Sequence, residues 1–67
     1  MRFRQLEVFH AVMTAGTVTQ AARNLSVSQP SVTASIQQME EEIGFLLFVR
    51  SSGRLTPTAE ARILFEE

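Results

Sequence analysis

The feature that most constrains this sequence is a pair of consecutive helices whose ends are marked by the residues themselves. The second helix of this pair, called the third helix below because another is predicted upstream, is expected over about Gln29–Ile43. Apolar residues recur there at spacings of four, three and four, and a glycine follows. Ser28 is the expected N-cap and Pro30 suits the first turn. Since proline has no N–H, the Ser28 oxygen is expected to accept from the N–H of Ser31.

A shorter helix precedes it in "TVTQAARNL", where Thr17 is followed three residues later by Gln20, the pattern of a reciprocal capping box. Its apolar face is formed by Val18, Ala21, Ala22 and Leu25. A short helix, a turn of about four residues and a longer helix make a helix–turn–helix, which in DNA-binding proteins lays its second helix in the major groove. Many small helical domains contain such a hairpin without nucleic acid, so this pattern alone leaves both interpretations open.

A further helix is predicted upstream in "FRQLEVFHAVMTAG", with Leu6, Phe9, Val12 and Met13 at helical spacing and Gly16 as its cap. No good N-cap residue precedes it, so the sequence does not indicate its first residue.

Downstream, "LLFVR" and "RLT" predict two short strands joined by a serine- and glycine-containing turn. Thr56 followed by Pro57 predicts an N-cap and the first residue of a fourth helix. That helix, "TAEARILFEE", ends without a capping signal and is expected to begin a longer one.

Composition excludes several classes of protein. The 67 residues suffice for one small domain, and 45% hydrophobic with 19% charged residues argues against disorder. Without cysteine there are no disulfides or thiolate metal sites, and no apolar run approaches the ~18 residues of a membrane span. We therefore expect a cytoplasmic protein with no membrane partner.

Catalytic groups are scarce. His10 is the single histidine, without cysteine or aspartate to pair with it, and is expected to be structural and partly exposed. Glu40, Glu41 and Glu42 point around a helix rather than to one place, which predicts a solvated helix end instead of a metal site. We therefore predict no enzyme and no metal or other cofactor in this chain.

Several short motifs together resemble the N-terminal domain of LysR-type transcriptional regulators. They are "LEVF", "AG-V-AA--L-VSQP", "I--ME-E-G", "LFVR" and "LTPT", and they cover essentially residues 3–58 in register and without gaps. The resemblance implies a mainly α winged helix–turn–helix with a three-helix core, a two-stranded wing and the start of a linker helix. It divides the chain into a DNA-binding domain over 1–58, with the helix–turn–helix at about 18–37 and the wing at about 46–56, and a linker start over 59–67.

The resemblance also implies a function and partners. The expected function is sequence-specific binding of double-stranded DNA by a bacterial regulator, in the cytoplasm at the nucleoid. The third helix would read the major groove and the wing would contact the phosphate backbone. A homodimer or higher homo-oligomer is expected through the linker helix, and a small-molecule inducer on a separate effector-binding domain that these residues do not include.

The candidate DNA-binding residues lie at the start of the third helix and on the wing. They are Ser28, Gln29, Pro30, Ser31, Thr33, Ala34, Arg50 and Arg54. For Ser28 and Pro30, helix capping alone is an adequate explanation. The resemblance implies that Arg50 contacts phosphate, whereas Ala34, Gln37 and Gln38 stand where relatives often carry arginine or lysine.

The stretch between Arg23 and Glu40 carries no charge, and the formal net charge of the chain is −1. A neutral helix can still read DNA, because glutamine, serine and threonine match donor and acceptor patterns in the major groove, while charge supplies mainly phosphate affinity. The alternative that this neutrality favours is a winged-helix module for protein interaction or dimerisation with little DNA binding.

Overall fold

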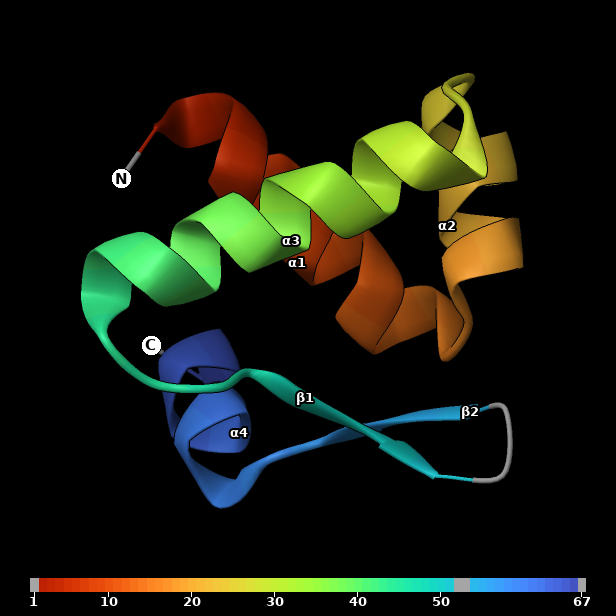
Figure 1. The fold of residues 1–67 in the computed structure, drawn as a ribbon. Helices are drawn as coiled ribbons and strands as arrows, with labels where there is room; N and C mark the ends of the chain where they lie inside the picture. Colours follow the sequence, from red (N-terminus) through yellow and green to blue (C-terminus); the bar gives the residue numbers. More distant parts are fainter. Residues whose placement is uncertain (1, 52–53, 67) are drawn as a thin grey trace.

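The computed structural model describes residues 2–51 and 54–66, without the side chains of Ser51 and Arg54. Over these residues the elements run in the order α1 (Phe3–Ala15), α2 (Val18–Leu25), α3 (Gln29–Ile43), β1 (Phe48–Ser51), β2 (Arg54–Pro57) and α4 (Ala59–Glu66). The first three helices pack on one another, with α3 crossing in front of α1, and the hairpin and α4 lie beneath them (Figure 1). This three-helix core with a two-stranded wing confirms the predicted winged helix–turn–helix.

Helix α3 has the predicted bounds. Its N-cap is Ser28, whose Oγ accepts a hydrogen bond from the Ser31 N–H at 3.3 Å, and Gly44 ends it in the left-handed region with φ 86°. Val32, Ile36 and Met39 are buried in the core, as their spacing predicts. The helix therefore presents its other faces to solvent and to the wing.

The start of α1 differs from the expected apolar face. Leu6 is 38% exposed, whereas Gln5 is 4% exposed and is buried in its place. The Gln5 side chain is hydrogen-bonded at both ends, since its Oε1 accepts from the Arg2 backbone N–H and its Nε2 donates to Glu42, each at 3.0 Å. Because the oxygen and the nitrogen of the amide are both hydrogen-bonded, this polar side chain can be buried at a core position.

In α2, half of the predicted capping box forms. Thr17 Oγ1 accepts from the Gln20 N–H at 3.1 Å, but the Gln20 side chain donates to Asn24 at 2.9 Å instead of returning to Thr17. Ala21 and Ala22 are buried and allow α2 to approach its neighbours closely.

The wing is the antiparallel hairpin of β1 and β2, in which Phe48 pairs with Pro57, Val49 with Thr56, Arg50 with Leu55 and Ser51 with Arg54. The predicted N-cap of the fourth helix is wrong. Pro57 closes β2, and Thr58 is the residue whose Oγ1 accepts from the Ala61 N–H at 3.1 Å. The Thr58 hydroxyl also donates to the Leu46 carbonyl at 2.9 Å, so a contact distant in sequence fixes where α4 begins.

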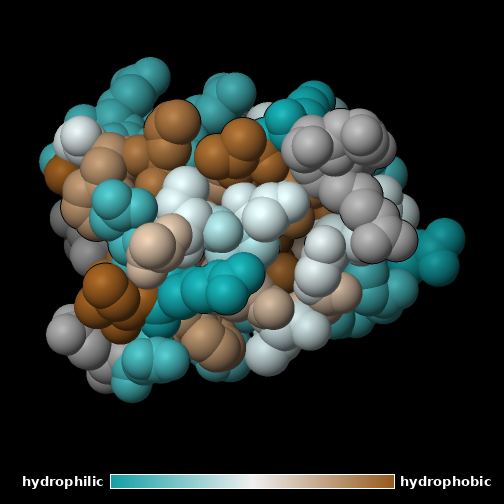
Figure 2. Space-filling view, turned by 90° about the horizontal axis from the view of Figure 1, so that it is seen from below, coloured by the Kyte–Doolittle hydropathy of each residue, from teal (hydrophilic) through white to brown (hydrophobic). Residues whose placement is uncertain are grey.

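The core joins all of these elements. Its buried apolar residues are Val8, Phe9, Val12, Ala21, Ala22, Val32, Ile36, Met39, Leu47, Phe48 and Ala61. Hydrophobic side chains also reach the surface on the side of α4 and the wing, between polar ones (Figure 2). None of the helices over the described residues is long and apolar enough to cross a membrane.

Candidate functional site

The first turn of α3 carries most of the predicted site residues, and they share one exposed end of the molecule. Gln29, Pro30, Ser31 and Ala34 are exposed, and Thr33 is half-buried. We call residues 29–34 the reading end. The turn before it is sharp, because Ser26 adopts the left-handed conformation with φ 58° and closes α2.

Two hydroxyls at this end already have partners. Ser28 Oγ accepts from the Ser31 N–H, and the oxygens of the two serine hydroxyls are hydrogen-bonded at 2.9 Å. The amide of Gln29 makes no hydrogen bond within the part of the chain that the structure describes. Ser28 therefore serves the helix as a cap, and Gln29 presents free donors and acceptors to a ligand.

A groove runs between α3 and the wing. Its walls come from α2, α3 and both strands, and the residues lining it are Val18, Thr33, Ile36, Gln37, Glu40, Phe48, Arg50 and Leu55. The groove brings Thr33 of the reading end and Arg50 of the wing to one surface, as the site prediction requires. The backbone of Arg54 pairs with Ser51 in the hairpin, while its side chain lies outside the described part of the chain.

Gln37 belongs to the same surface, although the sequence prediction left it out of the site. It is exposed, lines the groove and follows Thr33 by four residues, one helical turn along the same face. Gln29, Thr33 and Gln37 thus form a row of neutral donors and acceptors. The i, i+4, i+8 spacing in the sequence is the signal that could have identified Gln37.

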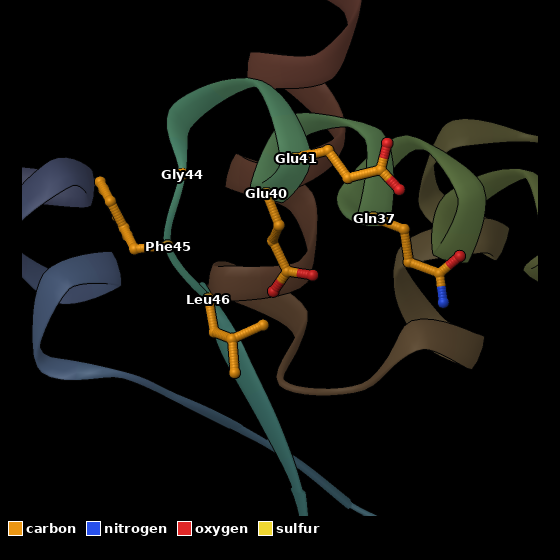
Figure 3. A pocket seen from close by; sticks show the side chains of 6 residues that line it. All are labelled: Gln37, Glu40, Glu41, Gly44, Phe45 and Leu46. Atoms are coloured by element: carbon orange, nitrogen blue, oxygen red, sulfur yellow. The ribbon is translucent and has the colours of Figure 1, made fainter.

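The acidic end of α3 matches the predicted solvated end at Glu41 and Glu42, which are exposed, but not at Glu40, which is half-buried. Glu40 Oε2 accepts hydrogen bonds from the backbone N–H of Leu47 at 2.7 Å and of Phe48 at 3.2 Å. Figure 3 shows the Glu40 side chain reaching from α3 toward the chain before β1, while the side chains of Glu41 and Gln37 point elsewhere. Of the three acids, Glu41 is the one that is exposed and makes no side-chain hydrogen bond within the described part of the chain.

Glu42, at the same end of α3, connects this helix to α1. Its carboxylate accepts from Gln5 Nε2, and this hydrogen bond holds the pKa of Glu42 below its usual value of 4.5. The guanidinium of Arg2 acts weakly in the same direction. Glu42 therefore remains ionised to lower pH than a free glutamate.

The remaining polar groups do not assemble a catalytic centre within the described residues. His10 is exposed, and its ring centroid lies 5.0 Å from that of Phe65 on α4. No group of three or more histidine, aspartate or glutamate side chains in that part of the chain could hold a metal ion. The chemistry that the site offers is binding: amides and hydroxyls suited to base edges, beside a guanidinium suited to phosphate.

A family model described as "Bacterial regulatory helix-turn-helix protein, lysR family" matches residues 3–62. Over the whole chain, the sequence is 54% identical to the HTH-type transcriptional regulator DgcR of Pseudoalteromonas sp. It is 49% identical, also over the whole chain, to the transcriptional activator protein LysR of Escherichia coli (strain K12). The chain spans 23% and 22% of the lengths of these two relatives, less than a quarter of each.

Solved structures agree with this similarity. A crystal structure of a CbnR_DBD–DNA complex superposes with a TM-score of 0.93 and 41% identity, over 98% of this chain and 76% of that one. A crystal structure of BenM_DBD with catB site 1 DNA gives a TM-score of 0.93 and 35% identity, over 98% of this chain and 74% of that one.

Proposed function

Because the chain belongs to the lysR family of bacterial regulatory helix–turn–helix proteins, we propose that it binds double-stranded DNA as the DNA-binding domain of a transcriptional regulator. The reading end of α3 enters the major groove, and the wing lies on the phosphate backbone. The observation that carries this proposal is the groove that brings Thr33, Gln37 and Arg50 to one surface. Thr33 and Gln37 offer hydrogen-bond donors and acceptors to base edges, and Arg50 beside them offers a guanidinium to a phosphate.

The charges along α3 set the orientation on DNA. The reading end is neutral and most of its side chains are exposed, whereas Glu40, Glu41 and Glu42 lie at the other end of the helix. Phosphates repel carboxylates, so the N-terminal end of α3 approaches the groove first. Arg50 on β1 is then on the flank of the helix, where a guanidinium meets the backbone of the duplex.

A salt-titrated binding assay tests the proposal. Fluorescence anisotropy would measure the affinity for a random-sequence duplex and for a duplex selected from a random pool. We expect tighter binding to the selected duplex, and a log K that falls linearly with log salt on both. Equal affinity for the two would contradict sequence-specific reading. Binding to neither would favour the alternative, a protein-interaction or dimerisation module.

We further propose that α4 contributes to a homodimer and that the protein acts in the cytoplasm. Ile63 is 60% exposed and Phe65 is 37% exposed, which leaves apolar surface on α4. From the family resemblance we also propose that a small-molecule inducer binds the protein outside these 67 residues. Sedimentation of this chain beside a regulator that includes more of the linker helix tests the dimer.

A further inference from the structure

The carboxylate of Glu40 joins the helix that carries the reading end to the strand that carries Arg50. We infer that Glu40 is a positioning residue, which holds the wing at a fixed angle to α3 so that Arg50 reaches phosphate while the reading end lies in the groove. This inference rests on the proposed function and adds to it how the two halves of the site act together.

The base of the wing needs such a support. Its first rung pairs Phe48 with Pro57, and a proline has no N–H to donate across the ladder. A two-stranded hairpin alone is only marginally stable in water. The rung is therefore held from outside the hairpin, by Glu40 on the α3 side and by Thr58, whose N–H donates to the Leu47 carbonyl at 2.9 Å.

Two bonds to one oxygen make this support directional. Glu40 Oε2 accepts from two successive backbone N–H groups, at 2.7 Å from Leu47 N and 3.2 Å from Phe48 N. A single bond would leave β1 free to rotate about it, whereas two fix both the position and the tilt of the strand. Bonds to an ionised acceptor are also shorter and stronger than neutral ones.

The position of Arg50 turns this support into a functional one. Arg50 follows Phe48 by two residues, so it lies on the same face of β1, roughly 7 Å along the strand at ~3.3 Å per residue. A change of tilt at Phe48 therefore displaces the Arg50 guanidinium relative to α3. Phe48, Arg50 and Glu40 also line the groove together, so the displacement alters that groove itself.

Glu41 provides a matched control. It is the next residue on the same helix and carries the same charge, but it is exposed and points away from the wing (Figure 3). A change that acts through net charge or helix propensity should affect both positions alike. A change that acts through the wing should affect Glu40 alone.

The decisive variants are Glu40→Asp and Glu40→Gln. Aspartate keeps the negative charge but is one methylene too short to reach both N–H groups, and glutamine keeps the reach but loses the charge. Salt-titrated anisotropy on a random-sequence duplex would compare both with Glu41→Asp and Glu41→Gln. We expect Glu40→Asp to make the slope of log K against log salt shallower by about 0.9, which corresponds to the loss of one phosphate contact. Glu40→Gln should make the slope shallower by less.

A double-variant cycle separates positioning from general stability. If Glu40 acts by placing Arg50, then Arg50→Ala should weaken binding in the wild type and change little in the Glu40→Asp background. An undiminished effect of Arg50→Ala in that background would overturn the inference. The inference would also be overturned if Glu40→Gln bound DNA more tightly than the wild type while Glu40→Asp bound it equally well. That result would mean that Glu40 acts only by repelling the phosphates.

Amide hydrogen exchange on the free protein gives a second readout that requires no DNA. The N–H groups of Leu47 and Phe48 should exchange about tenfold faster in Glu40→Asp and at the wild-type rate in Glu41→Asp. Unchanged exchange would also overturn the inference. If the wild type bound no duplex at all, the proposed function would fail, while this measurement would still decide whether Glu40 holds the wing.

Discussion

At the scale of single residues, a side chain can contact DNA best with those donors and acceptors that are not already hydrogen-bonded within the fold. The Ser28 oxygen accepts from the Ser31 N–H, so its main contribution is to start α3. The Gln29 amide has no such partner within the described residues, and the side chain of Arg50 is exposed on β1. Of the predicted site residues, Gln29 and Arg50 are therefore expected to give the clearest effects on binding.

Replacing Gln29 with alanine should remove a contact to a base edge. We expect Gln29→Ala to weaken binding to the selected duplex by ~1–3 kcal/mol and to relax preference at one or two base pairs, with little change on random DNA. Gln38→Ala, at another exposed glutamine on α3, is the control. Equal losses on both duplexes would show that Gln29 does not read sequence.

Replacing Arg50 with alanine should instead remove a phosphate contact. We expect Arg50→Ala to weaken binding to selected and random duplexes alike and to reduce the salt slope by about one unit. Arg4→Ala removes the same charge from α1 and serves as the control. The expectation fails if Arg50→Ala lowers helicity in circular dichroism, because the loss then comes from the fold.

At the scale of elements, the sequence predicted those whose signals are local. For α3, the N-cap serine, the apolar period and the terminal glycine all agree, and the helix has the predicted bounds. The start of α4 was misplaced, because the Thr58 hydroxyl gains a bond to the Leu46 carbonyl that no local pattern reveals. The half-buried Glu40 was misjudged for the same reason, and the burial of Gln5 was not predicted, since the partners of both side chains are distant in the sequence.

The same distinction applies to the site. The residues of the reading end were predicted from capping signals and resemblance, and in the structure Gln29, Pro30, Ser31 and Ala34 are exposed. Gln37 shares a helix face with Gln29 and Thr33 at a spacing that the sequence itself contains. The hydrogen bonds of Glu40 to the backbone of Leu47 and Phe48 depend instead on how the wing packs against α3. Which residues touch DNA remains a prediction.

The bond between α1 and α3 predicts a pH dependence. The hydrogen bond from Gln5 lowers the pKa of Glu42 in the folded chain below its usual 4.5, so this bond stabilises the fold above that pH. The stabilisation is lost as the pH falls through the lowered pKa. Thermal melts should therefore show a smaller acid-induced loss for Glu42→Gln than for the wild type below about pH 4.5.

Glu41→Gln is the control for that comparison, because Glu41 is exposed and should leave the acid dependence unchanged. Parallel acid profiles for the wild type and Glu42→Gln would contradict the role assigned to the Gln5 bond.

At the scale of the whole molecule, the formal net charge of −1 provides no general attraction to DNA. We expect Ala34→Arg to raise affinity for every sequence and to steepen the salt slope by about 0.9, because Ala34 is exposed at the reading end. Thr19→Arg, at an exposed position on α2, tests whether any added charge suffices. An unchanged slope for Ala34→Arg would place that residue away from phosphate.

Self-association is the second property of the whole chain. Helix α4 spans 8 residues, and isolated helices below ~12–15 residues are marginal, so we expect the 67-residue chain to dimerise only at high concentration. Analytical ultracentrifugation over a concentration series measures this. A tight dimer would contradict the expectation, and Ile63→Glu would then test whether the exposed face of α4 forms the contact.

The bond from the Thr58 N–H to the Leu47 carbonyl joins the residue before β1 to the residue after β2. The two ends of the wing are therefore joined by a hydrogen bond, and the chain between them forms a closed loop. Doubling the length of such a closed loop costs only ~0.6 kcal/mol in chain entropy. Turns of different lengths and sequences can thus be inserted between Ser51 and Arg54 without redesign of the helices, which makes the connection between the two strands an interchangeable part.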